Sequence, residues 1–366
     1  APITFTSSAA TPGRGIWSGI YFYDTSYDQN SLGHAVIEYA ATGVSASSAR
    51  VSLSHLALAN NTTGINLASS SSSVSSCTIA NSVTGIYLDR SSPVIAGCTI
   101  RDSQGYGVRV RDYCSPRIEN NHILWSNNGI YTDGCYSNPT LANNIVRNNV
   151  GSGIYLACNS SATIAFNTLH ANGTGINLQM SGTATVSSNI ISSNNTGIYK
   201  SNGTCNPSYN NLWDNALDYS GLSAGATDLA VDPLYLDPVT GDLRLQPGSP
   251  LLEAAADGTE IGAYGSGGDP PGFTFGCTST IPTTSGSLTC HETWSGYIEI
   301  TGNVTVPFGT TLRIEPGTAI RFANGTGLQI YGRFHADGTE TAPITFTSSA
   351  ATPGRGIWSG IYFYDT

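Results

Sequence analysis

Charged side chains that could perform acid–base chemistry gather at one point of a repeating pattern. They are Asp89, Arg90, Arg111, Asp112 and Asp133, which fall four or five residues after successive glycines. A polysaccharide lyase needs carboxylates for calcium and a basic residue, and this set is the nearest candidate in the chain. Opposite charges on neighbouring repeats also form simple surface ion pairs, and this is the role that we expect here.

Other catalytic patterns are missing from the sequence. Glycoside hydrolases place two carboxylates across the bond that they cleave, and no two aspartates are adjacent in this chain. His122 has no second histidine or carboxylate at ligand spacing, so we expect no metal site there. We find neither a Ser-His-Asp set nor a phosphate-binding loop. The sequence therefore predicts no catalytic residue, no metal site and no cofactor.

The charged residues belong to a repeat that runs from Thr63 to Asn211. Its glycines are 21, 22, 22, 24, 22 and 22 residues apart, and each precedes a short run of alternating apolar residues. They are Gly64, Gly85, Gly107, Gly129, Gly153, Gly175 and Gly197. Short alternating runs at this period are too brief for helix pairs and fit one turn of a parallel β-helix.

The register predicts where each side chain of a coil lies. The apolar residues after the glycines point inward: Ile65, Ile86, Val108, Ile130, Ile154, Ile176 and Ile198. The next residues point outward: Asn66, Tyr87, Arg109, Tyr131, Tyr155, Asn177 and Tyr199. These outward tyrosines either cover the sheet, stack on sugar rings or pack against a neighbouring filament.

A small polar residue recurs about fourteen residues after each glycine. This column consists of Cys77, Cys98, Asn121, Asn144, Asn167, Asn189 and Asn211. An asparagine at a coil corner can accept a hydrogen bond from one coil and donate to the next. We therefore predict a buried asparagine ladder along the solenoid.

These motifs resemble the right-handed parallel β-helix repeat family, the pectate-lyase-like architecture of many secreted and surface proteins. The resemblance covers nearly the whole chain and implies an all-β, right-handed parallel β-helix solenoid with about 22 residues per coil. It also implies that 231–265, which ends in IGAYG, is a terminal coil, and that 294–349 contains opening coils. A fold of this kind specifies structure far better than function.

The chain contains one segment twice. Residues 1–25 recur without a substitution at 342–366, an offset of 341 residues. We therefore interpret 1–265 as the coils of one unit, including the terminal coil, and the Gly- and Pro-rich stretch 266–276 as a linker. Residues 277–341 are then the N-terminal capping coils of the next unit, so the order within one unit is 277–341 followed by 1–276.

Eight cysteines favour an oxidising compartment. Residues at equivalent places on neighbouring coils lie within disulfide range, which predicts the pairs Cys77–Cys98 and Cys114–Cys135. Cys277–Cys290 would close a small loop, and Cys158–Cys205 would need a protruding loop. Glycosylation sequons agree with export and occur at Asn60, Asn61, Asn159, Asn172, Asn194, Asn202, Asn303 and Asn324.

The charge balance limits the partners of the chain. The formal net charge is −10 with a single lysine, so we expect no nucleic-acid partner, and no apolar run is long enough to predict a membrane span. We expect an extracellular or cell-surface structural protein, a filament or stalk whose partners are copies of itself placed head to tail. The alternative is a carbohydrate-binding adhesin, with surface glycans as partners, or a polysaccharide-degrading enzyme on the same scaffold.

Overall fold

The computed structural model describes most of the chain as strands and turns, and its described part contains no helix. The described residues are 2–23, 30–180, 182–239, 241–265, 278–279, 282–288, 291–306, 311–330, 333–336, 338–350, 352 and 354–363. They form two compact units. The first unit is Ala1–Tyr235 with Leu245–Phe273, and the second is Leu236–Arg244 with Thr274–Thr366.

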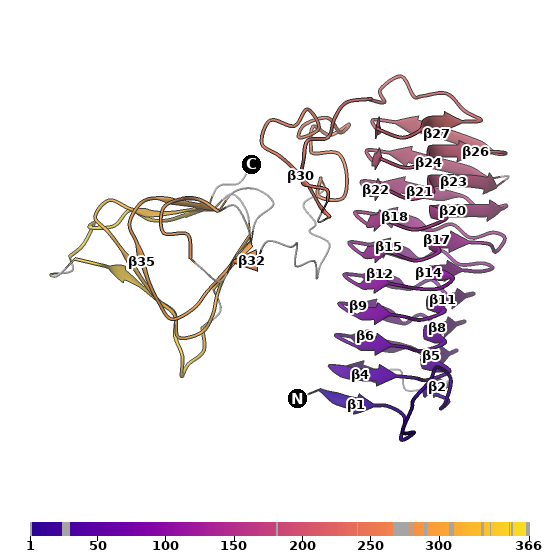
Figure 1. The fold of residues 1–366 in the computed structure, drawn as a ribbon, viewed down its shortest axis with the longest axis horizontal. Coiled ribbons are helices and arrows are strands. Elements are labelled where there is room, and N and C mark those ends of the chain that lie inside the picture. Colours follow the sequence, from indigo (N-terminus) through magenta and orange to yellow (C-terminus); the bar gives the residue numbers. More distant parts are fainter. Residues whose placement is uncertain are drawn as a thin grey trace. The chain divides into compact units, whose positions relative to one another are not determined.

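Three parallel sheets run along the first unit, and Figure 1 shows their strands stacked one above another. Sheet 1 contains β1 (Ile3–Phe5), β4 (Ala35–Glu38), β7 (Ala57–Ala59), β10 (Thr78–Ala80), β13 (Thr99–Arg101), β16 (His122–Leu124), β19 (Ile145–Arg147), β22 (Thr168–His170), β25 (Ile190–Ser192) and β28 (Asn211–Trp213). Sheet 2 contains β2 (Ile20–Tyr23), β5 (Thr42–Ser47), β8 (Thr63–Ala68), β11 (Thr84–Asp89), β14 (Tyr106–Val110), β17 (Asn128–Thr132), β20 (Ser152–Cys158), β23 (Thr174–Met180), β26 (Thr196–Lys200) and β29 (Leu217–Ser220). Sheet 3 contains β3 (Asn30–Gly33), β6 (Val51–Ser54), β9 (Ser73–Ser75), β12 (Val94–Ala96), β15 (Arg117–Glu119), β18 (Thr140–Ala142), β21 (Ala162–Ala165), β24 (Thr183–Ser187) and β27 (Thr204–Ser208).

The chain passes from sheet 1 to sheet 2 to sheet 3 in nine successive coils, and β28 and β29 begin a tenth, which confirms the predicted parallel solenoid of about 22 residues per turn. Ile65 pairs with Ile86, and Ile86 pairs with Val108, so the predicted inward column is in register. All three side chains have no exposed surface. Burial of one such aliphatic side chain contributes about 1.5–3 kcal/mol.

The repeated glycine is explained by the close approach of neighbouring coils. A Cβ atom on Gly64 would lie 2.5 Å from the carbonyl oxygen of Gly85 and 2.7 Å from Cγ2 of Ile79. Both distances are shorter than van der Waals contact, so any larger residue would push the coils apart.

The predicted asparagine ladder lies at the corner between sheets 3 and 1. Asn144 donates from its backbone N to Oδ1 of Asn167 at 3.0 Å, and its Nδ2 donates to the carbonyl of Ile118 in the preceding coil at 2.7 Å. The last asparagine of the ladder is Asn210 rather than the predicted Asn211, because Asn189 N donates to Asn210 Oδ1. The ladder then ends on Asp228, whose Oδ1 accepts from N and Nδ2 of Asn210.

A second asparagine ladder, which the sequence analysis missed, occupies the corner between sheets 1 and 2. Asn149 N donates to Asn172 Oδ1 at 3.1 Å, and Asn172 N donates to Asn194 Oδ1 at 2.8 Å. Asn194 continues to Asn215, whose Nδ2 donates to Asp218 Oδ1 at 2.8 Å. Two of the three corners are therefore joined by buried amides that run along the solenoid.

The stretch 231–265, expected to form a terminal coil, contributes no strand to sheets 1–3 in its described part. It contains β30 (Tyr235–Asp237) and β31 (Asp242–Leu245), which pair with each other. Residues 245–265, here called the cover segment, lie instead against the outer side of sheet 1. Gly262 N donates to Ser188 O at 3.0 Å, and Ala263 N donates to Thr168 Oγ1 at 3.0 Å.

The second unit is also built of parallel strands in three sheets. Sheet 4 contains β35 (Tyr297–Ile300), β38 (Ala319–Phe322) and β41 (Thr345–Ser348). Sheet 5 contains β33 (Gly286–Ser287), β36 (Val304–Val306), β39 (Gly327–Ile330) and β42 (Gly360–Phe363). Sheet 6 contains β32 (Thr278–Ser279), β34 (His291–Trp294), β37 (Thr311–Ile314) and β40 (Arg333–Ala336). The core of the second unit includes the buried side chains of Trp294 and Phe322. The predicted linker 266–276 lies outside the described residues.

Candidate functional site

The outer face of sheet 2 carries the charged and aromatic residues that the sequence analysis singled out. Arg109, on β14, bonds to Asp133 with an Nη2–Oδ2 distance of 2.5 Å. Both side chains are partly exposed, at 28% and 24%. The remaining pairs, Arg90–Asp89 and Arg111–Asp112, are longer at 3.9 Å each. The set is thus a row of surface ion pairs.

Tyrosine rings stack beside this ion pair. Tyr131 and Tyr155 have ring centroids 4.4 Å apart and an interplanar angle of 9°, and Tyr106 lies 4.6 Å from Tyr131 on the other side. Arg109 sits over the ring of Tyr106 at 5.0 Å. Burial, assisted by Tyr155, raises the pKa of Tyr131 to about 12, so its hydroxyl stays protonated at neutral pH. Tyr131 therefore has a neighbouring tyrosine ring on each of the two adjoining coils, stacked in Tyr155 and tilted by 38° in Tyr106.

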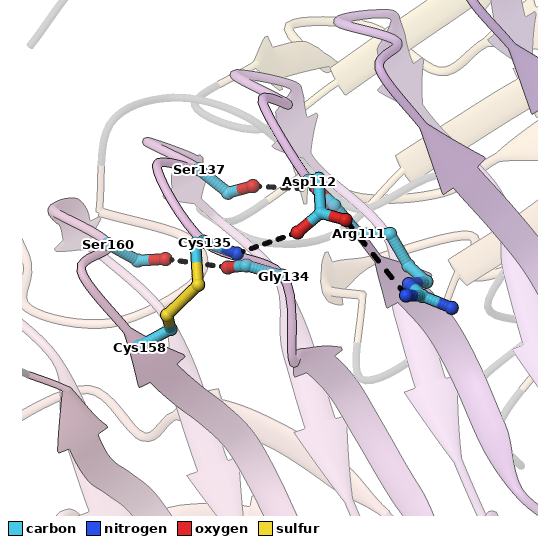
Figure 2. The surroundings of a disulfide bond; sticks show 7 residues. All are labelled: Arg111, Asp112, Gly134, Cys135, Ser137, Cys158 and Ser160. Atoms are coloured by element: carbon cyan, nitrogen blue, oxygen red, sulfur yellow. Dashed lines mark hydrogen bonds and ion pairs between the residues drawn. A yellow bond between two sulfur atoms is a disulfide. The ribbon is translucent and has the colours of Figure 1, made fainter.

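Among the described residues, the one disulfide joins Cys135 to Cys158 (Figure 2). The predicted pairs Cys114–Cys135 and Cys158–Cys205 are therefore wrong. Cys135 and Cys158 each stand two residues before a corner serine, Ser137 and Ser160, so they face each other on neighbouring coils.

Cys114 occupies the serine position itself, one coil earlier. Its N–H donates to Ser137 Oγ at 3.2 Å and its sulfur accepts from Ser91 N at 3.2 Å. Cys205 is also a free thiol, and burial raises its pKa to about 11.

Cys77 and Cys98 are buried free thiols, so the predicted disulfide between them does not form in the structure. They fill the first places of the corner column that continues with Asn121, and each sulfur donates to a carbonyl of its own coil, Ser75 O at 3.3 Å and Ala96 O at 3.5 Å. A hydrogen bond to Cys77, together with burial, holds the pKa of Cys98 well above its usual value. The predicted pair Cys277–Cys290 lies outside the described residues.

Three of the predicted glycosylation sites cannot carry a glycan in the folded chain. Asn61, Asn172 and Asn194 are 0%, 3% and 2% exposed, and their amides are bonded within the corner. An amide that already bridges two coils has no room for a sugar. The sequons that lie at the surface are Asn159, Asn202, Asn303 and Asn324, and Asn60 is half-buried.

The outer face of sheet 1 is the second polar region. His122 points outward, as expected, yet it has no exposed surface, and burial followed by the charge of Arg147 lowers its pKa to about 3. His170 bonds to Ser192 Oγ at 3.0 Å and meets the edge of Tyr235 at 5.7 Å. Burial lowers the pKa of His170 to about 4. This region is a second core between sheet 1 and the chain that covers it.

The described residues hold no group of three or more His, Cys, Asp or Glu side chains close enough to bind one metal ion. The same part of the chain shows no helix that could cross a membrane. The arrangement on sheet 2 supplies charge pairs and stacked rings. It does not bring a general acid and a general base together.

A family model and solved structures match this chain. The crystal structure of pectate lyase Pel9A matches with a TM-score of 0.47 and 16% identity over 72% of this chain and 86% of that chain. The PL6 family alginate lyase AlyGC matches with a TM-score of 0.30 and 14% identity over 95% of this chain and 74% of that chain. Comparison with curated proteins gave no significant match. A family model described as the right-handed β-helix region matches residues 14–123 and 63–213, more than half of the sequence, and the chain therefore belongs to the right-handed β-helix family.

Proposed function

We propose that this chain is a repeating part of an extracellular stalk or filament in which β-helix units follow one another head to tail. The observation that carries this proposal is the duplicated segment, because one copy opens the inward columns of the first unit and the other copy ends the inward columns of the second unit. The argument rests on the strand register within each unit.

The first copy opens the sheets of the first unit. Phe5, on β1, pairs with Ile37 of β4, and Ile20, on β2, pairs with Val44 of β5. Each of these residues belongs to an inward column of its sheet. The segment is therefore the coil on which the long solenoid is stacked.

The second copy stands last in the sheets of the second unit. Phe346, the counterpart of Phe5, pairs with Ile320 of β38. Ile361, the counterpart of Ile20, pairs with Leu328 of β39. Ile320 and Leu328 are buried core residues, so the copy continues the inward columns here too.

The strands of one 25-residue sequence thus pair with the capping coils on one side and with the long solenoid on the other, and the same residues face inward in both cases. Joining the units through it extends sheet 4 into sheet 1 and sheet 5 into sheet 2. This supports the order 277–341 followed by 1–276 within one β-helix. It follows that the chain holds the coils of one β-helix and then the opening coils of another.

The stacked tyrosines favour a structural role over carbohydrate binding. Sugar rings bind to the free face of an aromatic ring, and Tyr131 already has tyrosine rings within 4.4 Å and 4.6 Å on its two neighbouring coils. The disulfide Cys135–Cys158 and the exposed sequons support an extracellular location. The row of ion pairs on sheet 2 supports no catalytic role.

Electron microscopy of native material, combined with a denaturing, reducing gel, tests the proposal. The joined sheets 4 and 1 hold about twelve coils, which at about 4.8 Å each give roughly 60 Å of β-helix per unit. We expect elongated particles with this repeat and gel bands at multiples of one unit. Compact particles together with a single band near 38 kDa would contradict a tandem stalk.

A digestion assay tests the enzymatic alternative. Pectin, alginate and chondroitin, with and without calcium, should release no reducing ends or unsaturated products. Cleavage by the parent chain that disappears in Arg111→Ala or Asp112→Ala would support the enzymatic alternative and contradict the structural role.

A further inference from the structure

Two histidines occupy equivalent corner positions on neighbouring coils. His34 follows β3 and His55 follows β6, and both have a left-handed backbone with φ of 52° and 53°. The backbone N–H of His34 donates to Ser54 O at 3.2 Å, and that of His55 donates to Ser75 O at 3.1 Å. The coil stack therefore fixes the backbone that carries the two rings.

The two imidazole rings lie side by side at the surface. Their centroids are 4.6 Å apart and their planes differ by 14°. Both side chains are exposed, and they border a hollow of about 530 Å³ that is also lined by Pro2, Val36 and Ala57. Among the described residues, neither ring has a hydrogen bond or ion pair. Two nitrogen donors thus stand together without a protein partner.

The geometry points to a two-histidine chelate for a divalent transition-metal ion at His34 and His55. Imidazole nitrogen is a preferred ligand of Cu²⁺, Ni²⁺ and Zn²⁺. Two nitrogens bound to one tetrahedral ion at about 2.0–2.1 Å are about 3.3 Å apart. Rotation of the two exposed side chains would bring one nitrogen of each ring to this separation, and water would complete the coordination sphere.

The surroundings of the pair limit both the metal and the extent of the site. None of the described residues that line the hollow carries a carboxylate, so they offer Ca²⁺ and Mg²⁺ no suitable ligands. The same corner column continues with Ser76, Gly97 and Asn120, so the chelate is confined to two coils. Cu²⁺ should bind most tightly, in keeping with the general order of divalent affinities.

Calorimetric titration of the full chain with Cu²⁺ tests the site. We expect one ion per chain, and a loss of about 100-fold in affinity in His34→Asn and in His55→Asn, because each removes the chelate. Asparagine tolerates the left-handed backbone, so both variants should keep the fold, as circular dichroism would show. His335→Asn, which removes an exposed histidine of the second unit, is the matched control and should bind as the parent does.

A second measurement uses the parent chain alone, so it tests the site even if a variant fails to fold. In the parent chain, substoichiometric Cu²⁺ should broaden the imidazole proton resonances of His34 and His55 before those of other histidines. Equal broadening of all exposed histidines, an affinity unchanged in His55→Asn, or equally tight binding of Ca²⁺ would overturn the proposal.

Discussion

The corners of the coils and their outer faces repeat for different physical reasons. At a corner, Asn167 accepts from Asn144 and donates to the carbonyl of Leu141, and no other side chain of that length offers both groups. On the outer face of sheet 2, the equivalent positions hold Tyr131 in one coil and Arg109 in another, because only surface coverage is needed. The asparagines that recur from Asn121 to Asn189 therefore mark a buried hydrogen-bond ladder, whereas the mixed residue types on the outer face of sheet 2 mark a surface.

The largest expected effect separates these two regions directly. Asn167→Ala should lower the free energy of unfolding by about 3 kcal/mol, because it leaves a buried N–H of Asn144 and a carbonyl of Leu141 without partners. Denaturant unfolding measures this cost. The matched control is Asn177→Ala on the outer face, which should cost well under 1 kcal/mol. Equal costs for the two variants would erase the distinction between corner and face.

The covered part of sheet 1 is an outer face whose side chains are buried, so substitutions there should affect stability as strongly as substitutions at a corner. Burial lowers the pKa of His170 to about 4, below its usual 6.5, so the folded state resists protonation. The unfolded state binds the proton first, and the contribution is therefore lost as pH falls from about 6.5 to about 4. Above pH 6.5 the two states bind protons equally at this site.

Unfolding at pH 7 and pH 4 tests this linkage in the parent chain and in His170→Gln. The parent should lose roughly 2–3 kcal/mol more than the variant on acidification. An identical loss in both would mean that Tyr235 does not cover this histidine in solution.

A smaller effect is expected from the tyrosine stack. Tyr131→Ala should cost about 1 kcal/mol more than Tyr199→Ala, because Tyr131 has two ring neighbours and Tyr199 has none among the described residues. Thermal unfolding of both variants measures the difference. If Tyr199→Ala costs as much, coverage of the sheet rather than ring stacking provides the stability.

The smallest effect should come from the ion pair Arg109–Asp133. A double-mutant cycle with Arg109→Ala and Asp133→Ala should give a coupling of about 0.5 kcal/mol that shrinks in 1 M salt. A coupling above about 2 kcal/mol that persists in salt would mean that this ion pair contributes to stability as much as a buried corner hydrogen bond does.

The inward columns could be predicted from the sequence because an alternation of two residues leaves each side chain only one face. Thus Ile86 and Val108 are buried where the glycine spacing placed them. The same reasoning gave wrong disulfide pairs, because the number of residues between a glycine and a cysteine changes when a loop contains extra residues. The pattern Cys-x-Ser, present at Cys135 and Cys158 and absent at Cys114, was the signal that aligns the bonded pair.

The second ladder and the cover segment were less accessible. Asn172 and Asn194 satisfy a glycosylation motif, and the motif alone does not report that their amides are buried. The cover segment lacks a repeat of its own. The sign of its position lies in strands such as β16. All three residues of β16 are buried, so the alternation of buried and exposed residues seen in other strands is lost there.

The two asparagine ladders also give the first unit an electrical direction. In each ladder the backbone donors point toward the next coil, so their dipoles add along the axis with the positive end at the last coil. Both ladders finish on a carboxylate, Asp228 in one and Asp218 in the other. A negative group at the positive end of a row of aligned dipoles is the favourable termination, as it is at the start of a helix. The solenoid therefore has electrically distinct ends, and a copy of it placed in reverse would meet like polarity.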